Sequence, residues 1–259
     1  MQLSPYAMRF GLSLATMFGL AGCGKKGPLI YPDLLVPEAP QTVQVEQRGS
    51  SLQLAFDLPS KDRSGRALKE PFVIQVQRRE LNPDERGDCG SCPKDYQPSV
   101  RIDPEFPDPA IKFGKRIVLL DAEVRAGKQY QYRLQATRKD GESSAPVESQ
   151  RTAVCTAPPA PILRAKSVYG GYIVLEVSGQ LPENAELVGY GIYRVDGDTL
   201  MPYQPLVTTL AATSYQDQTV QRGVRYRYAA RMIVRRGDDV LASSELSPVV
   251  EISVADDPN

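Results

Sequence analysis

The chain of 259 residues carries 31 Lys and Arg against 31 Asp and Glu, so its formal net charge at pH 7 is zero. A chain without a basic excess is not expected to bind nucleic acid through its charge. The absence of histidine excludes the Ser-His and Cys-His nucleophile pairs and the most common zinc and haem ligands. We therefore expect no enzyme, no metal, no cofactor and no small-molecule substrate, in a chain long enough for two domains of about 100 residues each.

Residues 1–22 are predicted to be a signal peptide. Arg9 precedes the apolar run Phe10–Gly19, which has ten residues and is too short to cross a bilayer core of about 30 Å as a helix. The segment ends in Leu20-Ala21-Gly22-Cys23, which resembles the lipobox of bacterial lipoproteins. The alternative is an ordinary secretory peptide with a chance cysteine.

The lipobox resemblance implies a lipid anchor at the start of the mature chain. Cys23 is then the lipidated residue, and several fatty chains, palmitate among them, make membrane anchoring effectively permanent. Gly24 stands where Asp favours retention at the inner membrane in the enterobacterial sorting rule. The expected location is therefore the periplasmic leaflet of the outer membrane.

A second resemblance begins at the same cysteine. Residues 23–32 read CGKKGPLIYP and are similar to the opening of the small LptM (YifL) lipoproteins, which assist maturation of the lipopolysaccharide translocon. Ile30-Tyr31 departs slightly from the family's aromatic position. The resemblance implies a contact surface for a protein partner or an anionic lipid, made of Lys25, Lys26, Gly27, Pro28, Leu29 and Tyr31. The alternative is that the lysines lie near anionic head groups and the rest is spacer.

The segment 23–40 is expected to be a tether between the lipid and the first folded domain. Four prolines, Pro28, Pro32, Pro37 and Pro40, lie along it. Pro-rich linkers run extended, at about 3.1 Å per residue.

An internal repeat organises the rest of the chain. Residues 124–133 align without a gap on residues 220–229, at an offset of 96 residues. Upstream of each copy, apolar side chains alternate with others at Leu52, Leu54 and Phe56 and again in the run 173–177, which is typical of half-buried strands. A repeat of about 100 residues built from strands predicts two β-sandwiches.

The repeated pattern, a glycine followed three residues later by Tyr-x-Tyr, resembles fibronectin type III domains. The resemblance covers residues 41–156 and 158–254 and implies an all-β fold of two tandem immunoglobulin-like sandwiches. It also implies that Tyr130 and Tyr226 are corner tyrosines, whose rings pack in the core while their hydroxyls bond to the preceding turn. The Pro-rich hinge at 156–161 is expected to place the two sandwiches end to end.

The first copy contains an insertion at about 81–115, which is rich in Pro, Asp and Gly and is expected to form turns without a core. Cys89 and Cys92 lie within it. No helix signal follows them to support a redox pair, and without histidine a zinc site lacks ligands. A structural disulfide suits an oxidising periplasm. Either Cys155 bonds to one of these two, or Cys89 and Cys92 bond to each other and Cys155 stays free.

Two hypotheses on function follow. In the first, the chain is an outer-membrane lipoprotein and a non-catalytic binding module that engages the lipopolysaccharide translocon or its lipid. In the second, it is a structural spacer that scaffolds another complex of the cell envelope.

Overall fold

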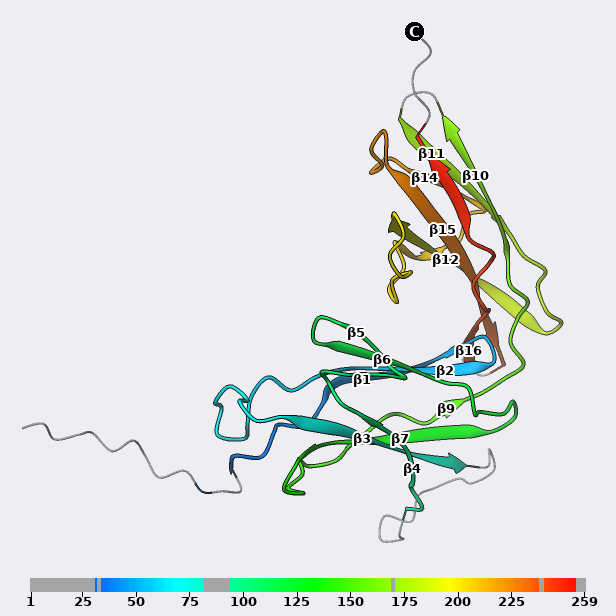
Figure 1. Ribbon diagram of the computed structural model, residues 1–259. Helices are drawn as coiled ribbons and strands as arrows, with labels where there is room; N and C mark the ends of the chain where they lie inside the picture. Colours follow the sequence, from blue (N-terminus) through cyan, green and yellow to red (C-terminus); the bar gives the residue numbers. More distant parts are fainter. Residues whose placement is uncertain (1–30, 32–33, 82–93, 169–170, 238–239, 255–259) are drawn as a thin grey trace, which may run out of the picture.

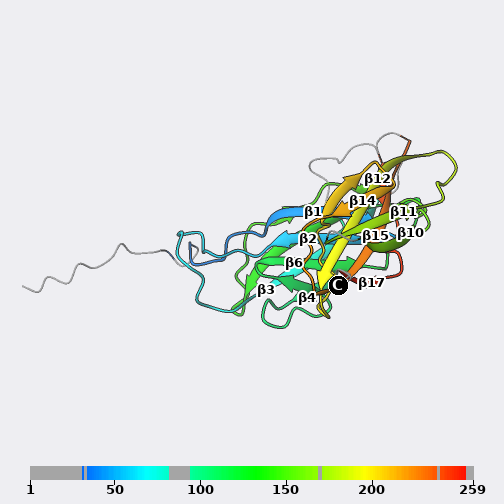
Figure 2. The same ribbon diagram turned by 90° about the horizontal axis from the view of Figure 1, so that it is seen from above.

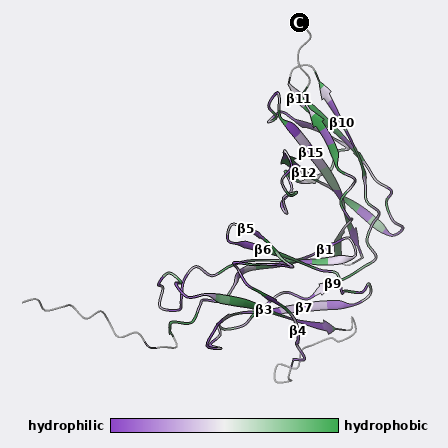
Figure 3. Ribbon diagram, viewed as in Figure 1, coloured by the Kyte–Doolittle hydropathy of each residue, from purple (hydrophilic) through white to green (hydrophobic). Residues whose placement is uncertain are grey.

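The structure, a computed structural model, describes residues 31, 34–81, 94–168, 171–237 and 240–254. Within these ranges the chain forms β-strands and no α-helix (Figure 1). Buried hydrophobic side chains gather in two separate clusters, one from each half of the chain. Figure 3 shows both hydrophobic and hydrophilic residues along the strands, as expected of strands that bury one face. The chain is therefore all-β, with two cores.

The first core lies between two sheets. One sheet has the strand order β1-β2-β6-β5, and the other has the order β4-β3-β7-β8, with β9 also paired to β7. The strands are β1 (Gln41–Arg48), β2 (Ser51–Asp57), β3 (Phe72–Leu81), β4 (Gln97–Ile102), β5 (Ile111–Phe113), β6 (Arg116–Asp121), β7 (Gln129–Arg138), β8 (Val147–Glu148) and β9 (Thr152–Ala153). Leu52, Leu54 and Phe56 of β2 are fully buried between the sheets, as their alternation predicts.

The second core lies between a sheet of order β10-β11-β14 and a run of strands β13-β12-β15-β16, with β17 also paired to β15. The strands are β10 (Ile162–Val168), β11 (Tyr172–Ser178), β12 (Ala185–Asp196), β13 (Val207–Leu210), β14 (Ser214–Asp217), β15 (Arg225–Arg236), β16 (Val240–Ser243) and β17 (Val250–Ser253). Ile173, Leu175 and Val177 of β11 face this core.

The two sandwiches share one strand order. β1, β2, β3, β4, β6 and β7 of the first correspond to β10, β11, β12, β13, β14 and β15 of the second, and each sandwich ends in two short strands that pair with β7 or β15. This order is that of a fibronectin type III sandwich, with β5 as an addition in the first domain. The predicted fold class is confirmed.

Both corner tyrosines make the expected hydrogen bond. The backbone N–H of Arg125 donates to the Tyr130 hydroxyl at 3.0 Å, and that of Gln221 donates to the Tyr226 hydroxyl at 2.7 Å. Both rings are buried. The offset of 96 residues that relates Tyr130 to Tyr226 therefore also relates Arg125 to Gln221, whose N–H groups donate to them.

A buried carboxylate is repeated in the same way. In the first domain the Tyr132 hydroxyl and Arg78 Nη1 donate to Asp121 at 2.7 and 2.8 Å. In the second, the Tyr228 hydroxyl and Arg194 Nη1 donate to Asp217, both at 2.8 Å. Arg78 and Arg194 thus occupy equivalent positions, although the insertion separates Arg78 from Asp121 in the sequence. Each group ties three strands of one sandwich together across its core.

The insertion is more ordered than its composition indicated. Residues 82–93 lie outside the described residues, but 97–102 form the edge strand β4, and Ile102 is fully buried in the first core. Tyr96 lies between two arginines, with the Arg133 guanidinium carbon 4.1 Å and that of Arg79 5.2 Å from its ring centroid. The prediction of turns is therefore wrong for β4 and β5, and Ile102 packs into the core of the first domain.

The two sandwiches meet at a bend instead of lying end to end. In Figure 1 the second sandwich rises from one end of the first, and in the view from above, in Figure 2, its strands overlap those of the first. The contact is a parallel bridge between β1 and β16 at Arg48 and Ser243, which joins strands of both domains into one sheet. The prolines of the linker allow this bend, but the pairing of β1 with β16 determines it.

Candidate functional site

The predicted lipidated residue, Cys23, lies outside the described residues, as do most residues of the predicted contact surface: Lys25, Lys26, Gly27, Pro28 and Leu29. Tyr31 is described, and its side chain is 71% exposed. The exposed ring is free to meet a partner or a lipid, and the rest of the predicted surface stays a prediction.

The described end of the tether packs on the first domain. Val36 is buried, and its carbonyl accepts a hydrogen bond from the N–H of Arg63 at 3.0 Å. The N–H of Ser64 donates to the Leu34 carbonyl at 3.0 Å, and Asp62 forms an isolated bridge with Pro37. The part of 23–40 that begins at Leu34 is therefore docked, at the end of the first domain away from the bend.

The cysteines of the insertion, Cys89 and Cys92, lie outside the described residues. Cys155 forms no disulfide within the described residues, and burial raises the pKa of its thiol. The strand pairs Leu81–Gln129 and Gln129–Ala153 place the start of the insertion at the same end of the domain as Cys155. The pairing of the three cysteines stays a prediction.

Gln47 fastens the hinge to the first domain. Its side-chain amide nitrogen donates to the Cys155 carbonyl at 2.6 Å, and its amide oxygen accepts from the Cys155 N–H at 3.0 Å. The Gln47 carbonyl accepts from the Ser243 hydroxyl at 2.7 Å, and the N–H of Gly49 donates to the Ser243 carbonyl at 2.8 Å. One buried glutamine thus links the first domain, the hinge and the second domain.

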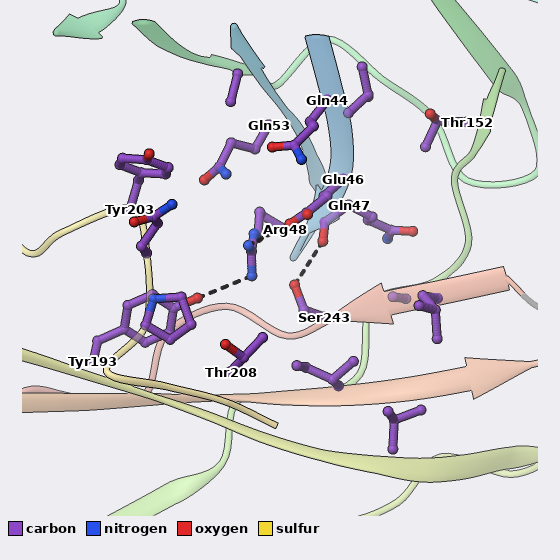
Figure 4. Close-up of a pocket in the computed structure, with 18 of the residues that line it drawn as sticks. Gln44, Glu46, Gln47, Arg48, Gln53, Thr152, Tyr193, Tyr203, Thr208 and Ser243 are labelled. Atoms are coloured by element: carbon purple, nitrogen blue, oxygen red, sulfur yellow. Dashed lines mark hydrogen bonds and ion pairs between the residues drawn. The ribbon is translucent and has the colours of Figure 1, made fainter. Parts of the chain in front are cut away.

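A cleft of about 810 Å³ lies inside the bend, next to this junction (Figure 4). Its size falls within the range of ligand-binding pockets. One wall comes from β1 and β2, and the other from β12, the segment before β13, and β16. Residues that line it include Gln44, Glu46, Arg48, Gln53, Tyr193, Tyr203 and Thr208.

Arg48 and Glu46 are the charged residues that line the cleft. Its Nη1 donates to the Tyr193 hydroxyl at 3.1 Å, and its Nη2 forms a salt bridge with Glu46 at 2.6 Å. The Arg48 Nε is buried and has no hydrogen-bond partner. Arg231 lies on the ring of Tyr193, with 5.9 Å from its guanidinium carbon to the ring centroid. Burial lowers the pKa of Arg231, and the nearby charge of Arg48 lowers it further.

An aromatic contact joins the two domains at Tyr203, which lines the cleft. The rings of Phe113 and Tyr203 lie 5.2 Å apart between centroids, at an interplanar angle of 45°. Phe113 belongs to β5 and Tyr203 to the segment between β12 and β13. The insertion therefore supplies the residue that meets the second domain, a role that its sequence did not indicate.

The cleft residues carry no motif, and sequence reasoning missed them. They come from positions between 44 and 243 and mix polar side chains, among them five glutamines, with apolar ones such as Val45, Val188 and Ile233. The one available signal was the position of β1 as a first, edge strand of a sandwich. No group of three or more carboxylate or thiol side chains that could hold a metal is found in the part of the chain that the structure describes.

Comparison with known proteins adds little beyond the fold. No protein-family model and no curated protein matches the sequence. Among solved structures, the chain is similar to the FN1-FN3 domains of chicken CNTN1, with 15% sequence identity, a TM-score of 0.37, and coverage of 85% of this chain and 69% of that one. Within the described residues, no helix has the length and apolar character needed to span a bilayer.

Proposed function

We propose that this chain is a lipoprotein of the outer membrane that works as a non-catalytic binding module in the periplasm. The observation that carries the proposal is the run Leu20-Ala21-Gly22-Cys23 ahead of two sandwiches that pair into one sheet. The run supplies an anchor, and the sandwiches supply edges and a cleft, which are surfaces that bind proteins.

The geometry of the tether supports this reading. The docked residues from Leu34 to Pro37 lie at the end of the first domain that is remote from the bend. A lipid on Cys23 would therefore hold that end toward the membrane and leave the cleft and the second domain available to a partner.

The lipopolysaccharide translocon is the partner that the residues 23–32 favour, through their similarity to LptM lipoproteins. Copurification through a C-terminal tag, after mild detergent extraction, tests it. Translocon proteins are expected with the wild-type chain and are lost when residues 24–32 are replaced by a Gly-Ser stretch of equal length. Absence of translocon proteins from the wild-type eluate contradicts this partner.

The second candidate function is a spacer that holds another envelope complex at a distance. The observation that favours it is the fixed bend, since Gln47 and the β1–β16 bridge leave the hinge little freedom. A spacer tolerates changes in the cleft but not in its length or rigidity. Substitutions at Thr208 and Gln53 that leave the envelope phenotype unchanged, together with a flexible hinge that alters it, would favour the spacer.

A further inference from the structure

We propose that the open edge of β1 inside the cleft binds an extended segment of a protein partner by adding it to the sheet as a further strand. The inference deepens the proposed function, because it names the place where a binding module would hold its protein partner, and it rests on that function.

The backbone of β1 is open along most of this edge. β1 pairs with β2 on one side and, on the other, with β16 only at Arg48 and Ser243. The Gln47 carbonyl and the Gly49 N–H both point to that second side, because Ser243 bonds to each of them. Backbone groups alternate along a strand, so the N–H and C=O of Val45 point to the same side. Val45 lines the cleft and has no strand partner there among the described residues.

β16 leaves this edge after a single bridge. The N–H of Ser244 donates to Met232 in β15, which sets the backbone groups of Ala242 toward β15 and those of Leu241 toward the cleft. Figure 4 shows β16 and β1 diverging from the contact at Ser243. The cleft therefore begins where one strand stops pairing with β1, and it occupies the place that the next stretch of strand would fill.

The dimensions suit a short extended peptide. Gln44 to Arg48 all line the cleft, and these five residues span about 13 Å of strand. Five consecutive lining residues cannot all turn their side chains inward, since side chains alternate between the faces of a strand. The edge of β1 is therefore exposed to the cleft, together with the outer face that β1 shares with Gln53 and Ala55 of β2.

The chemistry of the walls favours an uncharged segment. Glu46 and Arg48 neutralise each other at 2.6 Å, so the cleft offers no unpaired charge to attract an acid or a base. The buried Arg48 Nε lacks an acceptor, and a peptide carbonyl can supply one. Tyr203 and Gln204, from the segment before β13, line the cleft opposite β1 and offer a hydroxyl and an amide to the other side of the guest backbone.

Selection from a random peptide library tests the proposal. Phage-displayed peptides of about nine residues, a typical strand length, are panned on the full chain in detergent, and the best peptide is synthesised. Its affinity, measured by fluorescence anisotropy, is expected to fall about tenfold or more in Val45→Pro, which removes the outward N–H while the bonds to β2 remain. Methylation of the peptide nitrogens is expected to abolish binding at every second position only.

Ala165→Pro is the matched control. Ala165 lies in β10, an edge strand of the second domain, and its side chain is also half-buried against a core. The outward direction of its N–H follows from Val177, which bonds away from β10 to Thr213. Binding is expected to be unchanged in this variant, so a general effect of proline on edge strands is separated from an effect at β1.

Three results would overturn the proposal. They are a library that yields no peptide preferring the wild-type chain over Val45→Pro, a peptide that binds both equally, and a peptide whose affinity is insensitive to nitrogen methylation. Should Val45→Pro fail to fold, Thr208→Trp fills the cleft from the opposite wall without touching β1 and must weaken binding likewise. If translocon proteins do not copurify but peptide binding is intact, the translocon is wrong as the partner and the site on β1 stands. If translocon proteins copurify but no peptide binds, the site alone is wrong.

Discussion

Asp217 is a fully buried carboxylate, and its surroundings explain why it stays ionised. Arg194 and the Tyr228 hydroxyl donate to one oxygen, both at 2.8 Å, and Thr219 donates to the other through its N–H at 3.0 Å and its hydroxyl at 2.8 Å. Burial raises the pKa of Asp217, but these hydrogen bonds outweigh burial and hold its pKa below the usual range. The same group in the first domain is built around Asp121.

Asp217→Asn is expected to lower the free energy of unfolding of the second domain by about 2 kcal/mol or more, because it leaves Arg194 without its buried counter-charge. Urea unfolding followed by tyrosine fluorescence measures this. Glu251→Gln is the control, since Glu251 is exposed and lies 3.8 Å from the exposed Arg225. Its cost is expected to be about 0.5 kcal/mol or less, and equal costs in the two variants would contradict the role given to Asp217.

The stability difference between wild type and Asp217→Asn is expected to depend on pH. The folded pKa of Asp217 lies below that of the unfolded chain, which is about 3.9. The contribution of the carboxylate is therefore complete above the unfolded value and is lost as pH falls through the folded one. The free energies of unfolding of the two proteins should converge as the pH falls below about 4. A difference that stays constant over this range would mean that the charge contributes nothing.

At the scale of the elements, the sequence predicts those strands that are marked by a pattern of neighbouring residues. The alternation of Leu52, Leu54 and Phe56, and the corner motifs at Tyr130 and Tyr226, can be read within a few residues. β4 could not be read in this way, because most of its side chains are exposed and only Ile102 at its end is buried. Its strand conformation depends on pairing with β3, which is distant in sequence.

The turn between β1 and β2 is the element that carries the junction. Gly49 has φ +61°, in the left-handed region, and a Cβ added there would lie 1.8 Å from the Glu245 carboxylate oxygen. Glu245 in turn accepts a hydrogen bond from the N–H of Ser50 at 3.3 Å. The backbone conformation therefore favours glycine at position 49, and the Glu245 side chain must move to admit a Cβ there.

Gly49→Ala is expected to loosen the junction while both domains stay folded, because Glu245 must move and the backbone is strained by about 1 kcal/mol. Limited proteolysis in the hinge, at 156–161, is expected to speed up several-fold. Gly65→Ala is the control, with φ +83° and nothing near the added Cβ. It carries the same kind of strain without the contact, so equal proteolysis rates in the two variants would argue against the junction.

At the scale of the whole molecule, the bend is the feature that sequence reasoning missed. Linker composition predicts an extended arrangement, but the observed one depends on contacts between residues far apart in the chain. These contacts are Gly49 with Ser243, Arg48 with Tyr193, and Phe113 with Tyr203. No periodicity or motif marks them, since each needs both domains to be folded first.

Phe113→Ala is expected to increase the radius of gyration in small-angle scattering, since removing an aromatic pair worth about 1 kcal/mol lets the bend open more often. Phe106 belongs to the same insertion and is 77% exposed. Phe106→Ala should therefore leave the scattering curve unchanged. A wild-type curve that fits an extended molecule, or one that Phe113→Ala does not alter, would contradict a bend stabilised by this contact.

The proposed lipid anchor at Cys23 decides whether the cleft and the second domain work at a membrane. Labelled palmitate added to growing cells is the most direct test, followed by immunoprecipitation of the wild-type chain and Cys23→Ser. The label is expected in the wild-type chain, in the outer-membrane fraction, and is expected to be absent from Cys23→Ser. Labelling of Cys23→Ser, or an unlabelled wild-type chain, would contradict the account of this protein as a lipid-anchored binding module.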